Sequence, residues 1–134
     1  MSSLLYLLDT NTVSDSIKGS YPGVRSRLQR VPLEQLGISA ITEAELRYWS
    51  ILRPKEANTR ILVDAFLSRV PSMPWDSSVT LTYAQLRRDR KQSGRTLAEL
   101  DMLIAAHAIA LQAILVTHDS AFSRIAGLRT EDWV

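Results

Sequence analysis

Two short apolar runs near the two ends of the chain constrain the fold most strongly. The runs are LLYLL, residues 4–8, and AILVT, residues 113–117. Each is too short for a helix and is typical of a strand buried in a sheet. A third short strand is predicted over QLGIS, residues 35–39. Asp9 follows the first run directly, and Asp119 follows the second run after one histidine.

Helical spacing of apolar residues fills most of the sequence between these strands. Helices are predicted over residues 22–30, 42–52, 56–69, about 77–92 and 96–112. The segment VPSMPW holds two prolines, which predicts a short strand at a sheet edge. Strands separated by helices predict an α/β fold, a three-layer α/β/α sandwich with a central, mostly parallel sheet. We expect residues 4–8 and 113–117 to be adjacent and parallel in it.

The composition is that of an ordinary globular protein. A chain of 134 residues predicts one domain, residues 1–134, with a core large enough to need no disulfide. No apolar run approaches the roughly 18 residues of a membrane span, and the apolar start lacks the flanks of a signal peptide, so we expect no membrane association. The chain has no cysteine, which excludes thiolate metal sites and suits a reducing cytoplasm.

Asp9 and Asp119 are expected at the same rim of the sheet, because sites in parallel α/β sheets lie beyond the carboxyl ends of the strands. An ionised carboxylate beside a buried strand is costly unless a charge pairs with it. Each acid therefore lies either where a strand end is exposed to solvent or next to a cation.

Glu45 is a third candidate for this rim. Helical spacing puts it on one stripe with apolar neighbours and makes it the one charge on an inward face, while Glu43 points away and can pair with Arg47. A capping box from Thr42 to Glu45 is an alternative explanation. The stripe consists of Ile41, Ala44, Glu45, Tyr48 and Leu52.

Asp101 is the fourth candidate. It lies beside a predicted packed stripe and above the small residues Ala105 and Ala108. A capping box from Thr96 to Glu99 would account for Glu99 but leaves Asp101 without a local role. The packed stripe consists of Leu100, Leu103, Ile104, His107 and Leu111.

The histidines do not suggest a zinc site. His107 is expected to be a hydrogen-bonded core residue, whereas His118, beside Asp119, is more open to a functional role. Carboxylates suit a hard cation, Mg²⁺ or Mn²⁺, with water completing its coordination. Such a cation can activate water and polarise a phosphoryl oxygen. The candidate catalytic residues and metal ligands are Asp9, Glu45, Asp101 and Asp119.

A basic run, RRDRKQSGR, occupies residues 87–95 with five basic residues and one acid. Clustered Lys and Arg gain affinity for nucleic acid by releasing counterions from it. The run is therefore either a solvated helix end or a phosphate-binding patch.

Four segments of the chain resemble the PIN-domain family and, within it, the VapC-type toxin endoribonucleases of toxin–antitoxin pairs. They are LLDTNTVSD, ISAITEAELRYW, DMLIAAHAIA and LVTHDSAFSRIAGLRTEDW, in the family's order and spanning nearly the whole chain. The family's acidic positions fall on Asp9, Glu45, Asp101 and Asp119. Relatives often have asparagine at the last position, and a glycine-proline turn before the third that this chain lacks.

The resemblance implies a PIN-like fold and a cytoplasmic toxin that hydrolyses RNA phosphodiester bonds with Mg²⁺ or Mn²⁺. It also implies a homodimer and a cognate VapB-type antitoxin whose C-terminal segment inserts near the acidic site. Tyr48 and Trp49, aromatics expected to be exposed, are consistent with a dimer. The alternative is a PIN-like RNA-binding or interaction module that does not cleave, and the presence of all four acids argues against it.

Overall fold

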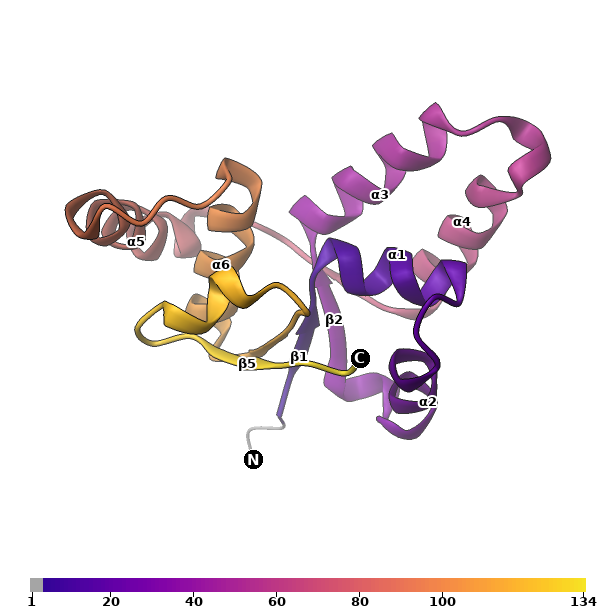
Figure 1. The fold of residues 1–134 in the computed structure, drawn as a ribbon, viewed down its shortest axis with the longest axis horizontal. Helices are drawn as coiled ribbons and strands as arrows, with labels where there is room; N and C mark the ends of the chain where they lie inside the picture. Colours follow the sequence, from indigo (N-terminus) through magenta and orange to yellow (C-terminus); the bar gives the residue numbers. More distant parts are fainter. Residues whose placement is uncertain (1–3) are drawn as a thin grey trace.

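A parallel sheet of five strands runs through the computed structural model, which describes residues 4–134 and so leaves the first three residues of the expected domain outside (Figure 1). The strand order is β3-β2-β1-β4-β5. Tyr6 pairs with Ile114 and Leu8 with Val116, which confirms that the two apolar runs are adjacent and parallel. The strands are β1 (Tyr6–Leu8), β2 (Leu36–Ser39), β3 (Ser72–Met73), β4 (Ile114–Val116) and β5 (Arg129–Glu131).

Helices connect these strands. The helices are α1 (Thr10–Lys18), α2 (Pro22–Arg30), α3 (Ala40–Leu52), α4 (Thr59–Arg69), α5 (Thr80–Ser93) and α6 (Glu99–Leu111). The short 3-10 segments within residues 4–134 are η1 (Leu33–Gln35), η2 (Lys55–Ala57), η3 (Ser77–Val79) and η4 (Ser120–Arg124). The prediction for α2 is confirmed at both ends, and β3 lies at the sheet edge as expected. Neither α1 nor β5 was predicted from the sequence.

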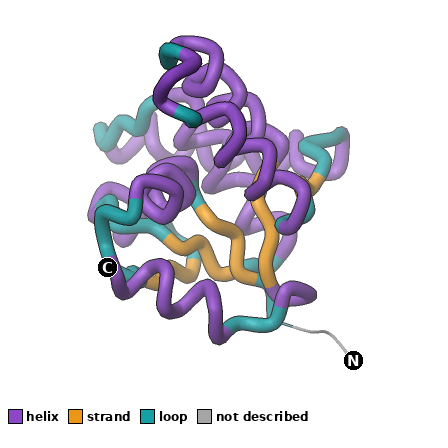
Figure 2. Tube along the Cα trace, turned by 90° about the vertical axis from the view of Figure 1, so that its right-hand side faces the viewer, coloured by secondary structure: helices purple, strands orange, loops and turns teal. Residues whose placement is uncertain are grey.

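Helices cover both faces of the sheet, which confirms the three-layer α/β/α sandwich (Figure 2). Side chains alternate along a strand, so Leu8 points to one face and Leu7 to the other. The first face packs against α1, α2, α3 and α4, and the second against α5, α6 and η4. The first core includes Val13, Val24, Leu46 and Val63, and the second includes Leu86, Ile104 and Phe122.

Four helix starts differ from the prediction. Helix α4 begins at Thr59 and α5 at Thr80, each about three residues later than expected, because the residues before them form η2 and η3. Helix α3 begins at Ala40, directly after β2, because the Ser39 hydroxyl accepts a hydrogen bond from the Ile41 N–H at 3.1 Å and caps it. Helix α6 begins at Glu99, after Ala98, which has no capping side chain. The capping boxes considered as alternative explanations at Thr42 and Thr96 are therefore both absent, and Glu45 has no capping role.

The strand order places a topological switch point at the centre of the sheet. From β1 the chain moves outward to β2 and β3, then returns to add β4 and β5 on the other side of β1. Sites in such sheets lie beyond the carboxyl ends of the strands where the order reverses, here β1 and β4. Among residues 4–134, no helix is both long enough and apolar enough to cross a bilayer.

Candidate active site

Asp9 lies at the switch point, immediately after β1, and is only 5% exposed. Its backbone N–H donates to the Val116 carbonyl at 3.0 Å, and its side chain accepts from the Thr12 N–H at 2.8 Å, so Asp9 also caps α1. Burial raises the pKa of Asp9 more than the hydrogen bonds from Thr117 and Thr12 lower it, and the charge of Asp119 raises it further. Ionised Asp9 is therefore costly without a nearby cation.

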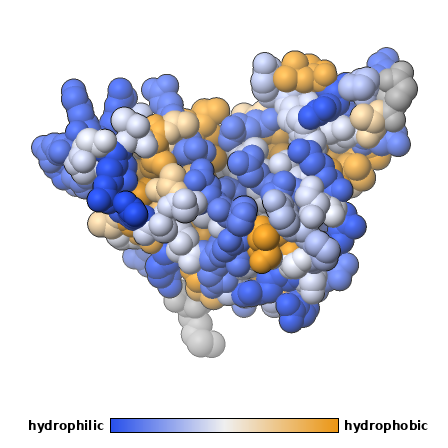
Figure 3. Space-filling view, viewed as in Figure 1, coloured by the Kyte–Doolittle hydropathy of each residue, from blue (hydrophilic) through white to orange (hydrophobic). Residues whose placement is uncertain are grey.

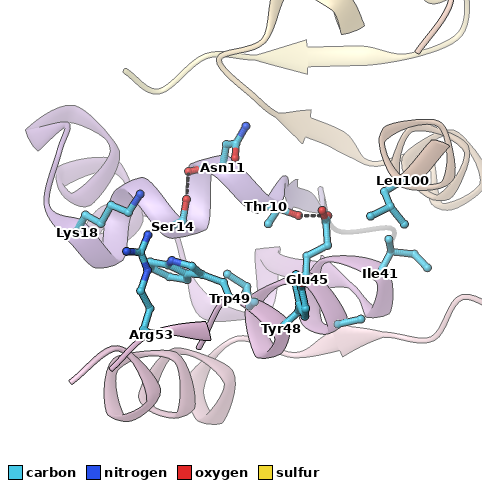
Figure 4. Close-up of a pocket in the computed structure, with 12 residues that line it drawn as sticks. Thr10, Asn11, Ser14, Lys18, Ile41, Glu45, Tyr48, Trp49, Arg53 and Leu100 are labelled. Atoms are coloured by element: carbon cyan, nitrogen blue, oxygen red, sulfur yellow. Dashed lines mark hydrogen bonds between the residues drawn. The ribbon is translucent and has the colours of Figure 1, made fainter. Parts of the chain in front are cut away.

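Glu45 extends from α3 to Thr10, the first residue of α1 and the neighbour of Asp9 in sequence. The Thr10 hydroxyl donates to the Oε1 of Glu45 at 2.6 Å (Figure 4). The same hydroxyl lies 3.2 Å from the hydroxyl of Thr42. Glu43 points elsewhere, since it pairs with Arg47 at 2.8 Å. Hydrogen bonds from Ser72 and Arg47 lower the pKa of Glu43. The predicted divergence of the two glutamates is confirmed.

The stripe around Glu45 was predicted to face the core, and this prediction is wrong. Tyr48 is 65% and Leu52 62% exposed, whereas Thr42 and Leu46 are the residues that α3 buries. Helical spacing identified residues on one side of the helix, but that side lines an open groove instead of the sheet.

The predicted packed stripe of α6 is also partly wrong, because its first and last residues are exposed to solvent. Leu100 is 46% and Leu111 38% exposed. The residues that α6 buries are Met102, Ile104, Ala105, Ala106, His107 and Ala108.

Asp101 lies half-buried in the first turn of α6. Burial raises its pKa, and the charges of Glu45, Asp119 and Asp9 raise it further, in that order. All four predicted site residues are thus within electrostatic range at one end of the sheet. Figure 1 shows the first turns of α1 and α3 meeting above the end of β1, with α6 beside them.

Asp119 completes the group from the exposed loop after β4. Its N–H donates to the Thr117 hydroxyl at 3.0 Å, and its side chain accepts from the Ala121 N–H at 2.9 Å, capping η4. These two bonds hold the loop, and the charge of Asp119 raises the pKa of both Asp9 and Asp101.

The donor set fits a hydrated hard cation. Within the described residues, no three His, Asp or Glu side chains already form a closed ligand cluster. The charges of neighbouring acids nevertheless raise the pKa of Asp9 and Asp101, and each of the four carboxylates offers oxygen donors. Mg²⁺ typically keeps several waters and binds through one or two carboxylates, which needs no closed protein cage.

The two histidines have structural partners. His107 is fully buried with its Nδ1 2.8 Å from the Ser39 hydroxyl, which confirms the predicted core histidine. Burial lowers the pKa of His107. His118 is exposed and its Nδ1 lies 2.7 Å from Asp132, a hydrogen bond that raises the pKa of His118. It ties the loop after β4 to the C-terminal segment.

Sequence reasoning missed the threonines that orient these acids. Thr10 holds Glu45, while Thr12 and Thr117 hydrogen-bond Asp9. Their positions in the sequence could have identified them, since each lies within three residues of Asp9 or Asp119.

The basic run lies at the end of α5 and the turn that follows it, and one of its arginines is not available to a ligand. Arg90 is buried, and its Nη2 donates to the Arg124 carbonyl at 3.4 Å. The remaining basic residues, Arg87, Arg88, Lys91 and Arg95, are exposed.

The chain is similar to several characterised proteins over almost its whole length. The PIN domain profile matches residues 6–128. The tRNA(fMet)-specific endonuclease VapC of Shigella flexneri is 31% identical over 131 residues, 97% of this chain and 98% of that protein. Ribonuclease VapC2 of Rickettsia felis is 33% identical over 132 residues, 97% and 98% of the two chains.

A solved structure shares the fold. The crystal structure of VapBC2 from Rickettsia felis, bound to a DNA fragment from their promoter, superimposes with a TM-score of 0.91. The match has 32% identity and covers 98% of this chain and 100% of that chain.

Replacing Asp101 with asparagine should stabilise the metal-free protein. Because the pKa of Asp101 is raised above 3.8, its ionised form costs folding free energy at neutral pH, and that cost disappears below pH 3.8. In chelator at pH 7 we expect Asp101→Asn to melt a few degrees higher than the wild type by calorimetry. The difference should shrink as the pH falls toward 3.8.

The exposed Glu34 provides a control, since Glu34→Gln should leave the melting temperature nearly unchanged at both pH values. A lower melting temperature for Asp101→Asn at pH 7 would contradict the placement of Asp101 among the other acids.

Proposed function

The chain belongs to the PIN-domain family and, within it, to the VapC ribonucleases, and from this membership we propose that it is the RNA-cleaving toxin of a toxin–antitoxin pair. The observation that carries the proposal is the meeting of four carboxylates from four segments at the switch point. The names of its relatives, a ribonuclease and a tRNA(fMet)-specific endonuclease, support RNA as the substrate class.

Asp9, Glu45, Asp101 and Asp119 would hold the metal, which we propose to be Mg²⁺ or Mn²⁺. When bound, such an ion supplies an activated water and neutralises charge on the phosphate. Asp9 is fixed by its backbone bond to Val116 and contributes a buried carboxylate. Thr10 holds Glu45 in one direction, so that its free oxygen can orient a water.

The acids also make the approach of RNA electrostatically unfavourable. Four like charges at one rim repel a phosphodiester, and the same repulsion adds to burial in raising the pKa of Asp9 and Asp101. Exposed cations, including those of the basic run, would offset the repulsion by contacting other phosphates.

The partners proposed are a VapB-type antitoxin and a second copy of the chain, in the cytoplasm. The neighbouring structure is a VapBC complex, which supports the antitoxin. Tyr48, Ile51 and Leu52 on α3 and Ile61 on α4 are each more than 60% exposed, and apolar residues gather over this end of the molecule in Figure 3. Trp49, also expected to be exposed, is half-buried.

Glu45 and Glu43 give the sharpest test of the catalytic site. Glu45→Gln keeps the shape but removes a charge, so RNA cleavage should fall by about 10²-fold or more. Asp9→Asn and Asp101→Asn should behave alike. Glu43→Gln loses a surface pair worth about 0.2–0.5 kcal/mol and should cleave normally. Gel assays with Mg²⁺, with Mn²⁺ and with chelator measure the rates.

Cleavage that survives in Glu45→Gln would remove Glu45 from the site. Wild-type protein that binds RNA but never cleaves it, with either metal, would instead favour the non-cleaving PIN-like module.

The exposed part of the basic run should strengthen RNA binding without contributing to cleavage chemistry. In an Asp9→Asn background, replacing Arg87, Arg88 and Lys91 with alanine should weaken RNA binding. The slope of log affinity against log salt should fall by about one for each lost phosphate contact. Arg90 is omitted because it is buried.

The control for this experiment is Arg30→Ala, an exposed arginine on α2 in the opposite helical layer. A salt slope equal in the triple variant and the control would assign the run to a solvated helix end.

The apolar surface on α3 and α4 should mediate self-association. Sedimentation velocity at micromolar concentration should give a dimer, and Ile51→Lys should shift it toward monomer because burying a charge there is unfavourable. Leu81→Lys, at a similarly exposed position on α5, is the control. A wild-type monomer would contradict the dimer and leave the catalytic proposal unaffected.

A further inference from the structure

A groove of about 620 Å³ begins at the acidic site and extends outward between α1 and α3. Thr10 and Glu45 line it near the acidic site, and Lys18, Trp49 and Arg53 line its other end (Figure 4). The groove is therefore continuous with the proposed catalytic centre.

Trp49 forms a fixed aromatic surface at the far end. Its ring is half-buried and packs against the first core, so it has little freedom to move. The Lys18 ammonium lies 5.3 Å and the Arg53 guanidinium 5.8 Å from the ring centre. Both are within the range of a cation–π contact, and both belong to exposed, flexible side chains.

The charges along the groove change sign from one end to the other. Glu45 is the acid at one end, and the cations Lys18 and Arg53 are at the other. Within the part of the chain that the structure describes, neither cation forms an ion pair with a carboxylate. An aromatic surface beside cations is the combination that binds single-stranded nucleic acid, because the ring stacks on a base and the cations contact its phosphates.

Helix geometry sets the distance from this cluster to the acids. Trp49 lies four residues after Glu45 on α3, about one turn or roughly 6 Å along the helix axis, and Arg53 follows directly after the end of α3. A strand whose scissile phosphate lies at Glu45 would therefore place a neighbouring nucleotide over Trp49.

We propose that Trp49, Lys18 and Arg53 form a subsite for an unpaired nucleotide next to the bond that is cut. This inference rests on the proposed ribonuclease function and adds to it the residues that hold the nucleotide beside the cut. The base stacks on Trp49, and Lys18 and Arg53 move from the ring to the adjacent phosphates. A base inside a duplex has both faces covered by its neighbours and cannot stack there.

The subsite can be tested by binding, separately from cleavage. In an Asp9→Asn background, a short fluorescein-labelled single-stranded RNA of mixed sequence is titrated and followed by anisotropy. Trp49→Ala should weaken binding by about 5- to 150-fold, the range of base–aromatic stacking, while Trp49→Phe should lose less. Lys18→Ala and Arg53→Ala should each reduce the salt slope by about 0.7. Arg60→Ala, an exposed arginine on α4, should match the parent.

Fluorescence separates stacking from a general loss of structure. RNA should quench the intrinsic tryptophan emission of the parent protein, and Trp49→Phe should lose that quenching although Trp75 and Trp133 remain. Melting curves of each variant identify any that fail to fold, and Lys18→Ala tests the subsite on an exposed residue.

Two results would overturn the subsite. One is unchanged RNA affinity in Trp49→Ala together with an unchanged salt slope in Lys18→Ala. The other is loss of antitoxin binding in these variants with RNA binding intact, which would assign the groove to the protein partner. Wild-type protein that cleaves RNA in either case keeps the proposed function, whereas absence of cleavage with normal subsite binding counts against that function alone.

Discussion

The repulsion among four carboxylates at the carboxyl end of β1 is the constraint on which the site depends. Burial and like charge both raise the pKa of Asp9 and Asp101, so the protein holds these groups where their ionised forms are least favourable. A fold selected only for stability would not keep them there. The proposed cation would offset this cost, because the same carboxylates that repel each other attract a divalent ion.

Hydrogen bonds hold this unfavourable arrangement in place. The Thr12 hydroxyl donates to the Val116 carbonyl at 3.1 Å, which joins α1 to the end of β4 beside Asp9. The contact between Ser39 and His107, 2.8 Å long and buried, joins the start of α3 to α6. It therefore links the helices that carry Glu45 and Asp101. Such a bond is stronger in the low dielectric of the interior than it would be in water.

The sequence predicted those parts of the fold that follow from local pattern. Residues 4–8 and 113–117 were recognisable as strands because few other structures bury so short an apolar run. β5 was missed because its residues are half-buried or exposed, and its place depends on backbone pairing with β4. The start of α3 was missed because Ser39 and Thr42 are both good caps, and only the end of β2 decides between them.

The direction in which a site residue points from its helix was predictable from the sequence. Whether that side of the helix is buried was not. Helical spacing separated Glu45 from Glu43 correctly, because it depends only on the helix itself. It could not tell which side of α3 meets the sheet, so the stripe with Tyr48 was wrongly placed in the core. Arg90 shows the same limit, since its burial under the Arg124 carbonyl depends on a segment distant in sequence.

The misplaced stripe has a functional consequence. Because the side of α3 with Glu45 and Tyr48 is open, the acidic site extends into a groove instead of ending in a closed pocket. A polymer can lie in such a groove with its reacting phosphate at one end and its neighbours along it. Binding energy gained at Trp49, Lys18 and Arg53 then offsets the electrostatic cost of bringing a phosphate to the carboxylates. The open face of α3 would thus contribute to catalysis through positioning, and an RNA too short to reach Trp49 would lose that contribution even though it contacts every acid.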